Sequence, residues 1–314
     1  MSNSTRSKTI SFAVRIAGTL ISTVLFIYLV SHQKWDVVFN KAAGIALWAV
    51  ALSLLFYLLS FFFNTLRWCI LLWAQAVKIT LWQAYRLTWA GNFASNFLPS
   101  TIGGDGFRML AVHPYTGRKT ISIGSVALDR IINMASMLCL IPIPLLMFGS
   151  SLRGLLGLSL VLPPGLEKLF SKYFPKIDAA FHAWASKPAA FVYAFLAAWP
   201  SNLFPMAVTY LLARQLGIQV SFWQVMGVQT VTYFLSVLPI SVNGYGLREV
   251  AYTTLYAALG ASVEQASTLA LVTRLLTVLA TVPGALWLSS TVTTAAGLND
   301  SPGSLRDNPD LPQP

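Results

Sequence analysis

The chain has 314 residues, of which 56% are hydrophobic and only 10% are charged, and its mean hydropathy is +0.65. An average soluble domain carries roughly a quarter charged residues, so this composition excludes an ordinary soluble globular protein. Because a transmembrane helix needs about 20 apolar residues, we predict an all-α, polytopic transmembrane helix bundle with about six or seven crossings.

The formal net charge is +11, from 21 Lys and Arg against 10 Asp and Glu. The cations lie between apolar runs, where they set the topology and meet anionic lipid headgroups, so we expect membrane lipids as partners and no nucleic acid. The two cysteines, Cys69 and Cys139, lack zinc-ligand spacing. No Walker A, H-E-x-x-H or G-x-S-x-G motif is present, so we predict no catalytic residue, no metal and no cofactor.

The N-terminal half begins with an apolar run over residues 10–30, preceded by Arg6 and Lys8. It is too long for a typical signal-peptide core, and we interpret it as an uncleaved first helix that enters from the cytoplasm. A second run over residues 43–63 continues as a polar-interrupted helix through Arg67 and Trp68. An Arg-Trp pair is typical of the headgroup layer, so we expect this pair to lie there.

The next segment, residues 81–98, is apolar but interrupted by polar side chains, and it ends at Pro99 before a glycine-rich stretch. Such a segment suits half of a broken or re-entrant helix pair that is buried in protein. A long helix is then predicted over residues 121–148, kinked at Pro142 and Pro144.

The middle of the chain is less regular. Residues 151–162 form a short candidate crossing, and residues 167–187 alternate aromatic and lysine residues as in a helix on the membrane surface. In the C-terminal half we predict a crossing over residues 191–212, a second broken helix over 222–238 and a last crossing over 266–289. The Pro- and Asp-rich tail, residues 297–314, is predicted to be disordered.

An internal repeat relates the two halves. Residues 79–83 (ITLWQ) resemble residues 220–224 (VSFWQ), and the pattern L-P-x4-G-x-G-x-R occurs at both 98–108 and 238–248. Residues 128–131 (LDRI) parallel residues 272–275 (VTRL) in the same order, which favours duplication over chance. We place repeat A at about 43–149 and repeat B at about 190–289 of a transmembrane domain that spans residues 1–296.

The orientation of the repeats depends on residues 151–162. If this segment crosses the membrane, most cations face the cytoplasm, both termini are cytoplasmic and the repeats are inverted; without it, the repeats are parallel. We predict the inverted arrangement, in which two glycine loops approach from opposite faces. Inverted repeats with broken helices are typical of transporters, which open a midplane site to one face at a time.

Two kinds of cationic position are candidate binding sites for an anion. In each repeat, a glycine turn before a helix would present backbone N–H groups together with an arginine fork. Arg130 and Arg274 lie well inside their helices, where an arginine should face the protein interior or a wet cavity. Asp129 diverges from its neighbour Arg130 on a helix, so we do not expect it to neutralise that arginine directly.

The candidate substrate-binding residues are therefore Gly104, Asp105, Arg108, Asp129, Arg130, Gly244, Gly246, Arg248, Glu249 and Arg274. The structural alternatives are glycines that only break a helix, arginines that reach lipid phosphates, and interhelical ion pairs. Polar residues of the broken helices could line a hydrophilic path or simply join helices by hydrogen bonds: Gln83, Asn92, Ser95, Asn96, Gln229, Thr230, Thr232 and Ser236. The Trp and Tyr residues are expected to form interfacial belts.

These motifs resemble those of a known family. The glycine-and-arginine loop at residues 98–108, the Asp129-Arg130 and Arg67-Trp68 pairs, and the second loop at residues 238–249 look like the transmembrane region of lysylphosphatidylglycerol synthases. The resemblance covers roughly residues 10–290. It implies a flippase-like inner-membrane protein that translocates or handles an anionic or modified lipid. The chain lacks the soluble aminoacyl-transferase domain of the bifunctional members, so aminoacyl transfer is not implied.

Three functions therefore remain open from the sequence. The first is a translocator of an anionic or modified lipid, of the phospholipid or polyprenyl-phosphate type. The second is a membrane enzyme that acts on a lipid headgroup, with Asp105, Asp129 or Glu249 as acid or base. The third is a non-catalytic lipid-binding scaffold of envelope biogenesis. The absence of a clustered acidic motif argues against the second, and the repeat favours the first.

Overall fold

A computed structural model describes residue 40, residues 42–96, 101–148, 184, 187–237 and 247–287. Throughout these residues all regular secondary structure is helical, as the composition predicts. The predicted first helix (10–30), the candidate crossing at 151–162, most of the amphipathic segment, the second glycine loop and the C-terminal tail lie outside the described residues.

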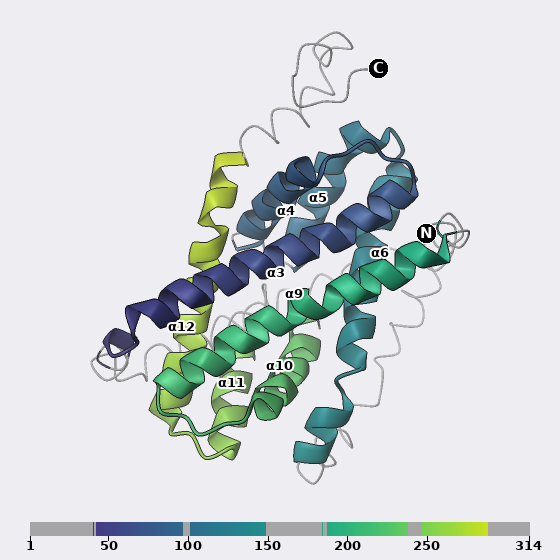
Figure 1. The fold of residues 1–314 in the computed structure, drawn as a ribbon. Coiled ribbons are helices and arrows are strands. Elements are labelled where there is room, and N and C mark those ends of the chain that lie inside the picture. The colour runs from purple at the N-terminus through teal and green to yellow at the C-terminus, as the bar shows by residue number, and fades with distance from the viewer. Residues whose placement is uncertain are drawn as a thin grey trace, which may run out of the picture.

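Two 28-residue helices, α3 (Leu47–Ala74) and α9 (Pro188–Gln215), lie side by side and antiparallel at the front of Figure 1. Three hydrogen bonds show that the two helices lie side by side along their whole length. The Ala46 amide donates to the Gln215 side chain (3.4 Å), Ser60 Oγ donates to the Ser201 carbonyl (2.7 Å), and Trp184 Nε1 donates to the Leu71 carbonyl (2.8 Å).

Two pairs of short helices pack behind this layer. Helices α4 (Leu81–Ser95) and α5 (Thr101–Thr116) lie at the top of Figure 1, and α10 (Phe222–Val237) and α11 (Leu247–Ala258) lie at the bottom. At 12 to 16 residues each, these helices are shorter than the roughly 20 residues that a crossing requires. The predicted broken helix pairs are therefore present as short helices.

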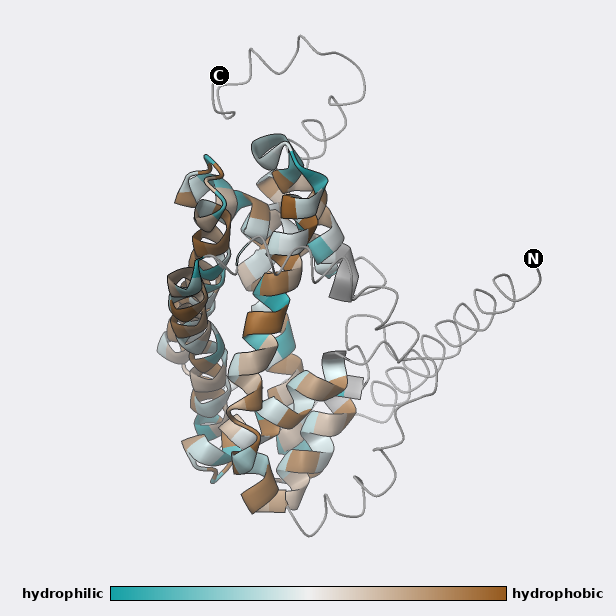
Figure 2. Ribbon diagram, turned by 90° about the vertical axis from the view of Figure 1, so that its right-hand side faces the viewer, coloured by the Kyte–Doolittle hydropathy of each residue, from teal (hydrophilic) through white to brown (hydrophobic). Residues whose placement is uncertain are grey.

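Two longer helices complete the second layer. Helix α6 (Lys119–Leu138) follows α5, and α12 (Val263–Thr281) follows α11 and continues into the 3-10 turn η1 (Val282–Gly284). Figure 2 views the two layers edge-on, with hydrophobic residues distributed over both. Four helices of the described part are long and apolar enough to cross a membrane: α3, α6, α9 and the stretch Val263–Trp287.

The turns after α3 and α9 are built in the same way. Ala76 and Gly217 both adopt positive φ, and the residue after each donates its amide to a carbonyl five residues earlier, Leu72 or Ala213. This arrangement satisfies the last carbonyls of each helix. A capping box then starts α4 at Thr80 and Gln83, and matching hydrogen bonds between Ser221 and Gln224 start α10. The resembling pentapeptides of the sequence thus perform the same structural role.

One predicted helix is divided. The structure ends α6 at Leu138, followed by a turn at 139–141 and a second helical segment at 142–148, instead of a kinked helix over residues 121–148. Proline lacks the amide hydrogen for the helical ladder and disfavours the helical conformation in the residue before it, so Pro142 begins a new segment.

Candidate functional site

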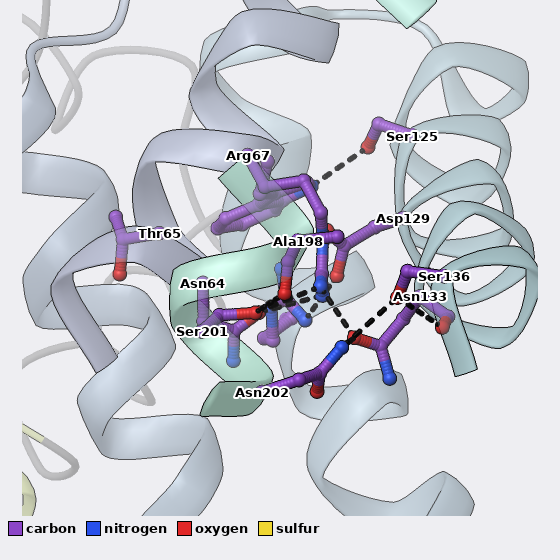
Figure 3. Close-up of polar contacts among 12 residues, drawn as sticks. Asn64, Thr65, Arg67, Ser125, Asp129, Asn133, Ser136, Ala198, Ser201 and Asn202 are labelled. Atoms are coloured by element: carbon purple, nitrogen blue, oxygen red, sulfur yellow. Dashed lines mark hydrogen bonds and ion pairs between the residues drawn. The ribbon is translucent and has the colours of Figure 1, made fainter. Parts of the chain in front are cut away.

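An ion pair between α3 and α6 lies at the centre of the bundle. Arg67 Nε donates to Asp129 Oδ1 at 2.6 Å, and the two residues are only 4% and 1% exposed (Figure 3). The prediction that Arg67 lies in the headgroup layer is therefore wrong. A buried carboxylate on the facing helix and the surrounding amides satisfy the guanidinium, so it has no need to reach the membrane surface.

A second arginine shares the same carboxylate. Arg108 of α5 donates through Nη1 to Asp129 Oδ2 at 3.2 Å, and its guanidinium carbon lies 4.1 Å from the ring centroid of Trp68. Trp68 is fully buried, so it does not belong to an interfacial belt. Nε and Nη2 of Arg108 are buried and have no hydrogen-bond partner among the described residues. Asp129 thus joins three helices through two arginines.

Asp105 and Arg130 form a neighbouring pair. Asp105 Oδ2 accepts a hydrogen bond from Arg130 Nε, and Asp105 Oδ1 lies 3.7 Å from Arg108 Nη1. The expectation that Asp129 does not neutralise Arg130 is confirmed, because Asp129 binds Arg67 and Arg108 while Arg130 binds Asp105. The Arg130 side chain is 40% exposed, so this pair lies at the edge of the buried cluster.

The first glycine cluster differs from the predicted turn. Helix α5 begins at Thr101, so Gly104 and Gly106 lie inside the helix and neither has positive φ. A Cβ at Gly104 would lie 2.6 Å from the carbonyl oxygen of Gly91, whereas a Cβ at Gly106 would meet nothing within 4 Å. Gly104 therefore permits close approach of α4 and α5, as small residues do in membrane helix pairs, and this packing places Arg108 against Asp129.

A polar cavity of about 300 Å³ lies beside the Arg67–Asp129 pair. Its walls come from α3, α4, α6, α9 and the last helix, and they contain five asparagines and two arginines. The lining residues are Ser60, Phe61, Asn64, Arg67, Asn92, Ser95, Asn96, Asn133, Ser201, Asn202, Arg274, Thr277 and Thr281. We call it the asparagine cavity.

Hydrogen bonds tie part of this wall to Arg67. Arg67 Nη1 donates to Asn133 Oδ1 at 2.6 Å, and Arg67 Nη2 donates to Asn64 Oδ1 at 2.8 Å. Asn202 Nδ2 also donates to Asn133 Oδ1 at 3.1 Å, and Asn133 Nδ2 donates to the Tyr233 hydroxyl at 3.0 Å. Figure 3 shows these amides converging on the guanidinium from α3, α6 and α9. The arginine is thereby fixed in one orientation at the cavity wall.

A second cavity of about 240 Å³ shares Asn202 with the first. It is more apolar: Met137, Asn202, Pro205, Met206, Gln229, Thr232, Tyr233, Ser236 and Arg248 line it. The Arg248 guanidinium carbon lies 5.4 Å from the ring centroid of Tyr252. One repeat-B arginine therefore lines each cavity, Arg274 the first and Arg248 the second.

The predicted site residues divide into three groups. Asp105, Arg108, Asp129 and Arg130 meet in one ion-pair cluster beside Gly104, while Arg248 and Arg274 lie at the two cavities. Gly244, Gly246 and the side chain of Glu249 lie outside the described residues.

The polar residues of the broken helices also divide. Six of them line the cavities: Asn92, Ser95 and Asn96 line the first, and Gln229, Thr232 and Ser236 line the second. Gln83 instead caps α4, and the Thr230 hydroxyl donates to the Met226 carbonyl within α10. Neither of these bonds joins two helices. The predicted interhelical hydrogen bonds are made by Asn96 Nδ2, which donates to Thr281 Oγ1, and by Gln229 Nε2, which donates to Thr209 Oγ1, so both predicted roles are present.

Sequence reasoning missed the buried position of Arg67 and the amides of Asn64, Asn133 and Asn202 around it. A usable signal existed, because an arginine within a long apolar run is expected to face the bundle interior and a partner. The positions of Asn133 and Asn202 were harder to predict, because a single amide on a membrane helix predicts a hydrogen bond but not its partner.

The cluster and the two cavities together carry an excess of positive charge. Their described charged side chains are five arginines, Arg67, Arg108, Arg130, Arg248 and Arg274, and two aspartates, Asp105 and Asp129.

Residues 15–284 match the family described as the lysylphosphatidylglycerol synthase TM region. The chain belongs to this family. The match covers every described helix, from α3 to η1, and it confirms the resemblance predicted from the motifs. The protein is thus an integral membrane protein of a family related to lipid modification. Among curated proteins, a search found no significant match to this chain.

Proposed function

We propose that this protein translocates a lipid with an anionic headgroup across the inner membrane, as a flippase-like member of the lysylphosphatidylglycerol synthase TM region family. The observation that carries the proposal is the asparagine cavity, which lies between the layer of α3 and α9 and the helices α4, α6 and α12, and has Arg67 and Arg274 in its wall. Arginine forks match phosphate oxygens, and the surrounding amides offer further donors.

The inverted repeat forms part of the proposal. Helices α9 and α10 begin 141 residues after α3 and α4, and α3 and α9 run antiparallel. Two pairs of residues with the same 141-residue spacing touch each other: Ser60 with Ser201, and Phe63 with Phe204, whose ring centroids are 5.9 Å apart. Contacts between equivalent residues are expected where a two-fold axis crosses a pair of elements. This supports two inverted halves that alternate in exposing the cavities. The cytoplasmic location of both termini rests instead on the distribution of Lys and Arg along the chain.

A reconstitution assay tests the proposal. Purified protein is placed in vesicles that contain acyl-labelled fluorescent phosphatidylglycerol, and an impermeant reductant reports how much label reaches the outer leaflet. Without translocation, the reductant bleaches only the labelled lipid in the outer leaflet. We expect the protein to raise the bleached fraction above this outer-leaflet half, and we expect Arg274→Gln to reduce the rate of translocation by at least tenfold. Arg118→Gln removes the same charge from an exposed residue at the start of α6 and should leave the rate unchanged.

The other two functions give different results in the same vesicles. A lipid-modifying enzyme would convert the labelled lipid into a product of different chromatographic mobility. A scaffold would bind the lipid without moving it. If the protein is well folded in the vesicles and the bleached fraction stays at the outer-leaflet half, translocation is contradicted.

A further inference from the structure

A surface groove of about 540 Å³ lies where α3 ends and α9 begins, at the right-hand end of the front layer in Figure 1. Among the described residues that line it, only Lys187 is charged, and the others are aliphatic or aromatic. Four of them are small: Ala74, Pro188, Ala189 and Ala190. The groove shares no described lining residue with either of the two cavities, so it is a separate feature of the molecule.

The two ends of the α3–α9 layer differ in the residues that form this groove. At the 141-residue spacing of the two helices, Pro188 and Ala189 correspond to Leu47 and Trp48 at the start of α3. Leu47 and Trp48 are large, so the repeat itself does not require small residues at these positions. The small residues at the start of α9 are therefore a feature of one end of the layer.

The same end of the bundle is cationic. Three exposed lysines lie within three residues of side chains that pack in one buried hydrophobic cluster: Lys78, Lys119 and Lys187, beside Val77, Ile79, Ile121 and Trp184. Among the acidic side chains that the structure describes, Asp105 and Asp129 are bound to arginines inside the bundle, and Glu264 lies in the first turn of α12, near the opposite end of α9. The charge at this end is thus complementary to an anionic headgroup.

The groove runs from a charged end to an apolar end. Helices of 28 residues are about 42 Å long, so the ends of α3 and α9 reach beyond a hydrocarbon core of roughly 30 Å into the headgroup layer. Lys187 lies at that level, and Tyr193 follows about 9 Å further along the helix axis. Trp73 and Tyr193 are 43% and 62% exposed, and aromatic side chains are enriched at this depth. A cation above an apolar groove matches the two parts of a phospholipid.

We propose that this groove holds one anionic phospholipid of the cytoplasmic leaflet, with an acyl chain between α3 and α9 and its phosphate beside Lys187. The distribution of Lys and Arg supports the cytoplasmic side for this end. Lysine near the membrane surface attracts the anionic headgroup, and the small residues let the chain pack closely against both helices. This lipid is a resident that joins the two long helices, distinct from the lipid that the cavities translocate.

Native mass spectrometry tests the inference on purified protein supplied with equal amounts of phosphatidylglycerol and phosphatidylcholine. We expect the wild type to retain phosphatidylglycerol about fivefold more than phosphatidylcholine, and Lys187→Gln to remove this preference. Arg214→Gln removes the same charge from an exposed residue at the opposite end of the layer and should leave the preference unchanged. Equal retention of the two lipids by the wild type, or an unchanged preference in Lys187→Gln, would overturn the inference.

A second variant closes the groove. Ala189→Trp introduces the residue that Trp48 provides at the equivalent position of α3, and we expect it to lose one phosphatidylglycerol molecule that the wild type retains. Ala189 is exposed, so the larger side chain does not overlap the core, and folded yield checks this. A folded Ala189→Trp protein that retains as much phosphatidylglycerol as the wild type would overturn the inference. A lipid-free dimer that this variant dissociates would also overturn it, because the groove would then bind a second copy of the chain.

The vesicle assay separates this inference from the proposed function. If phosphatidylglycerol crosses the membrane but Ala189→Trp retains as much of it as the wild type, translocation stands and the resident lipid fails. If no lipid crosses but Ala189→Trp still loses its bound phosphatidylglycerol, the resident lipid stands and translocation fails. Arg274→Gln changes the asparagine cavity alone, so it should slow translocation and still retain the phosphatidylglycerol molecule that Ala189→Trp loses.

Discussion

Asp129 is almost fully buried and accepts hydrogen bonds from Arg67 and Arg108 at once. Two cations around one buried carboxylate are stable only while that carboxylate remains. The adjacent Asp105–Arg130 pair is different, since its arginine is 40% exposed and can be solvated when the partner is lost. The same substitution is therefore expected to lower the free energy of unfolding by different amounts at the two aspartates.

We expect Asp129→Asn to lower the free energy of unfolding by about 3–5 kcal/mol, because it leaves two buried guanidiniums without a counter-ion. Asp105→Asn should cost about 1 kcal/mol or less, as for a partly exposed pair. Thermal unfolding of the purified proteins in detergent measures both. Equal melting temperatures for the two variants would show that burial does not separate these pairs.

At the scale of the elements, the close approach of α4 and α5 determines whether the cluster can form. Gly104 faces the backbone of Gly91, and a Cβ at Gly91 would in turn lie 2.9 Å from Arg108 Cγ. These two glycines thus set the distance between helices at the point where Arg108 leaves α5 toward Asp129. Gly106 lies in the same helix but meets no neighbour, which makes it a natural control.

Gly104→Ala is expected to destabilise the protein by about 1–3 kcal/mol, since the added methyl group overlaps a backbone oxygen and forces the helices apart. Gly106→Ala should be neutral or stabilise by up to about 1 kcal/mol, because alanine is the better residue in a helix interior. Folded yield and melting temperature distinguish the two. A Gly104→Ala protein as stable as the Gly106→Ala protein would contradict the proposed role of this contact.

At the scale of the whole molecule, the two helix pairs pack at opposite ends of the α3–α9 layer (Figure 1). Helices of 28 residues are about 42 Å long, enough to cross the hydrocarbon core of roughly 30 Å with some tilt. The turns that follow α3 and α9 are then expected on opposite sides of the membrane. Lys78 and Gln219 occupy matching exposed positions in these turns.

We predict that Lys78→Cys is labelled by an impermeant maleimide only from the cytoplasmic side, and Gln219→Cys only from the outside. The native Cys69 and Cys139 are replaced first, since Cys139 is exposed. Intact and lysed cells provide the two conditions, and the cysteine-free protein is the control. Labelling of both positions from the same side would refute the inverted arrangement.

The sequence by itself determined the membrane class and most helix positions, because apolar runs and helix-ending prolines are local signals. Its repeated motifs also indicated the family. The sequence also placed Arg130 and Arg274 in the interior, since charge at membrane depth is costly wherever it occurs, and it singled out Asp105 and Arg108 as part of a candidate anion-binding turn. Local signals did not reveal which charged side chains pair with each other. Asp129 lies beside Arg130 in the chain, yet it binds Arg67, which is 62 residues away.

The tertiary structure alone decided where the binding groups converge. Residues from α3, α4, α6, α9 and the last helix, which lie far apart in the sequence, meet around one cavity of about 300 Å³. It also showed that Gly104 serves helix packing, because only the position of Gly91 on the facing helix distinguishes a contact glycine from a turn glycine. The physical reason is that periodicity sets the face of each helix, whereas packing across the bundle selects the partners that this face meets.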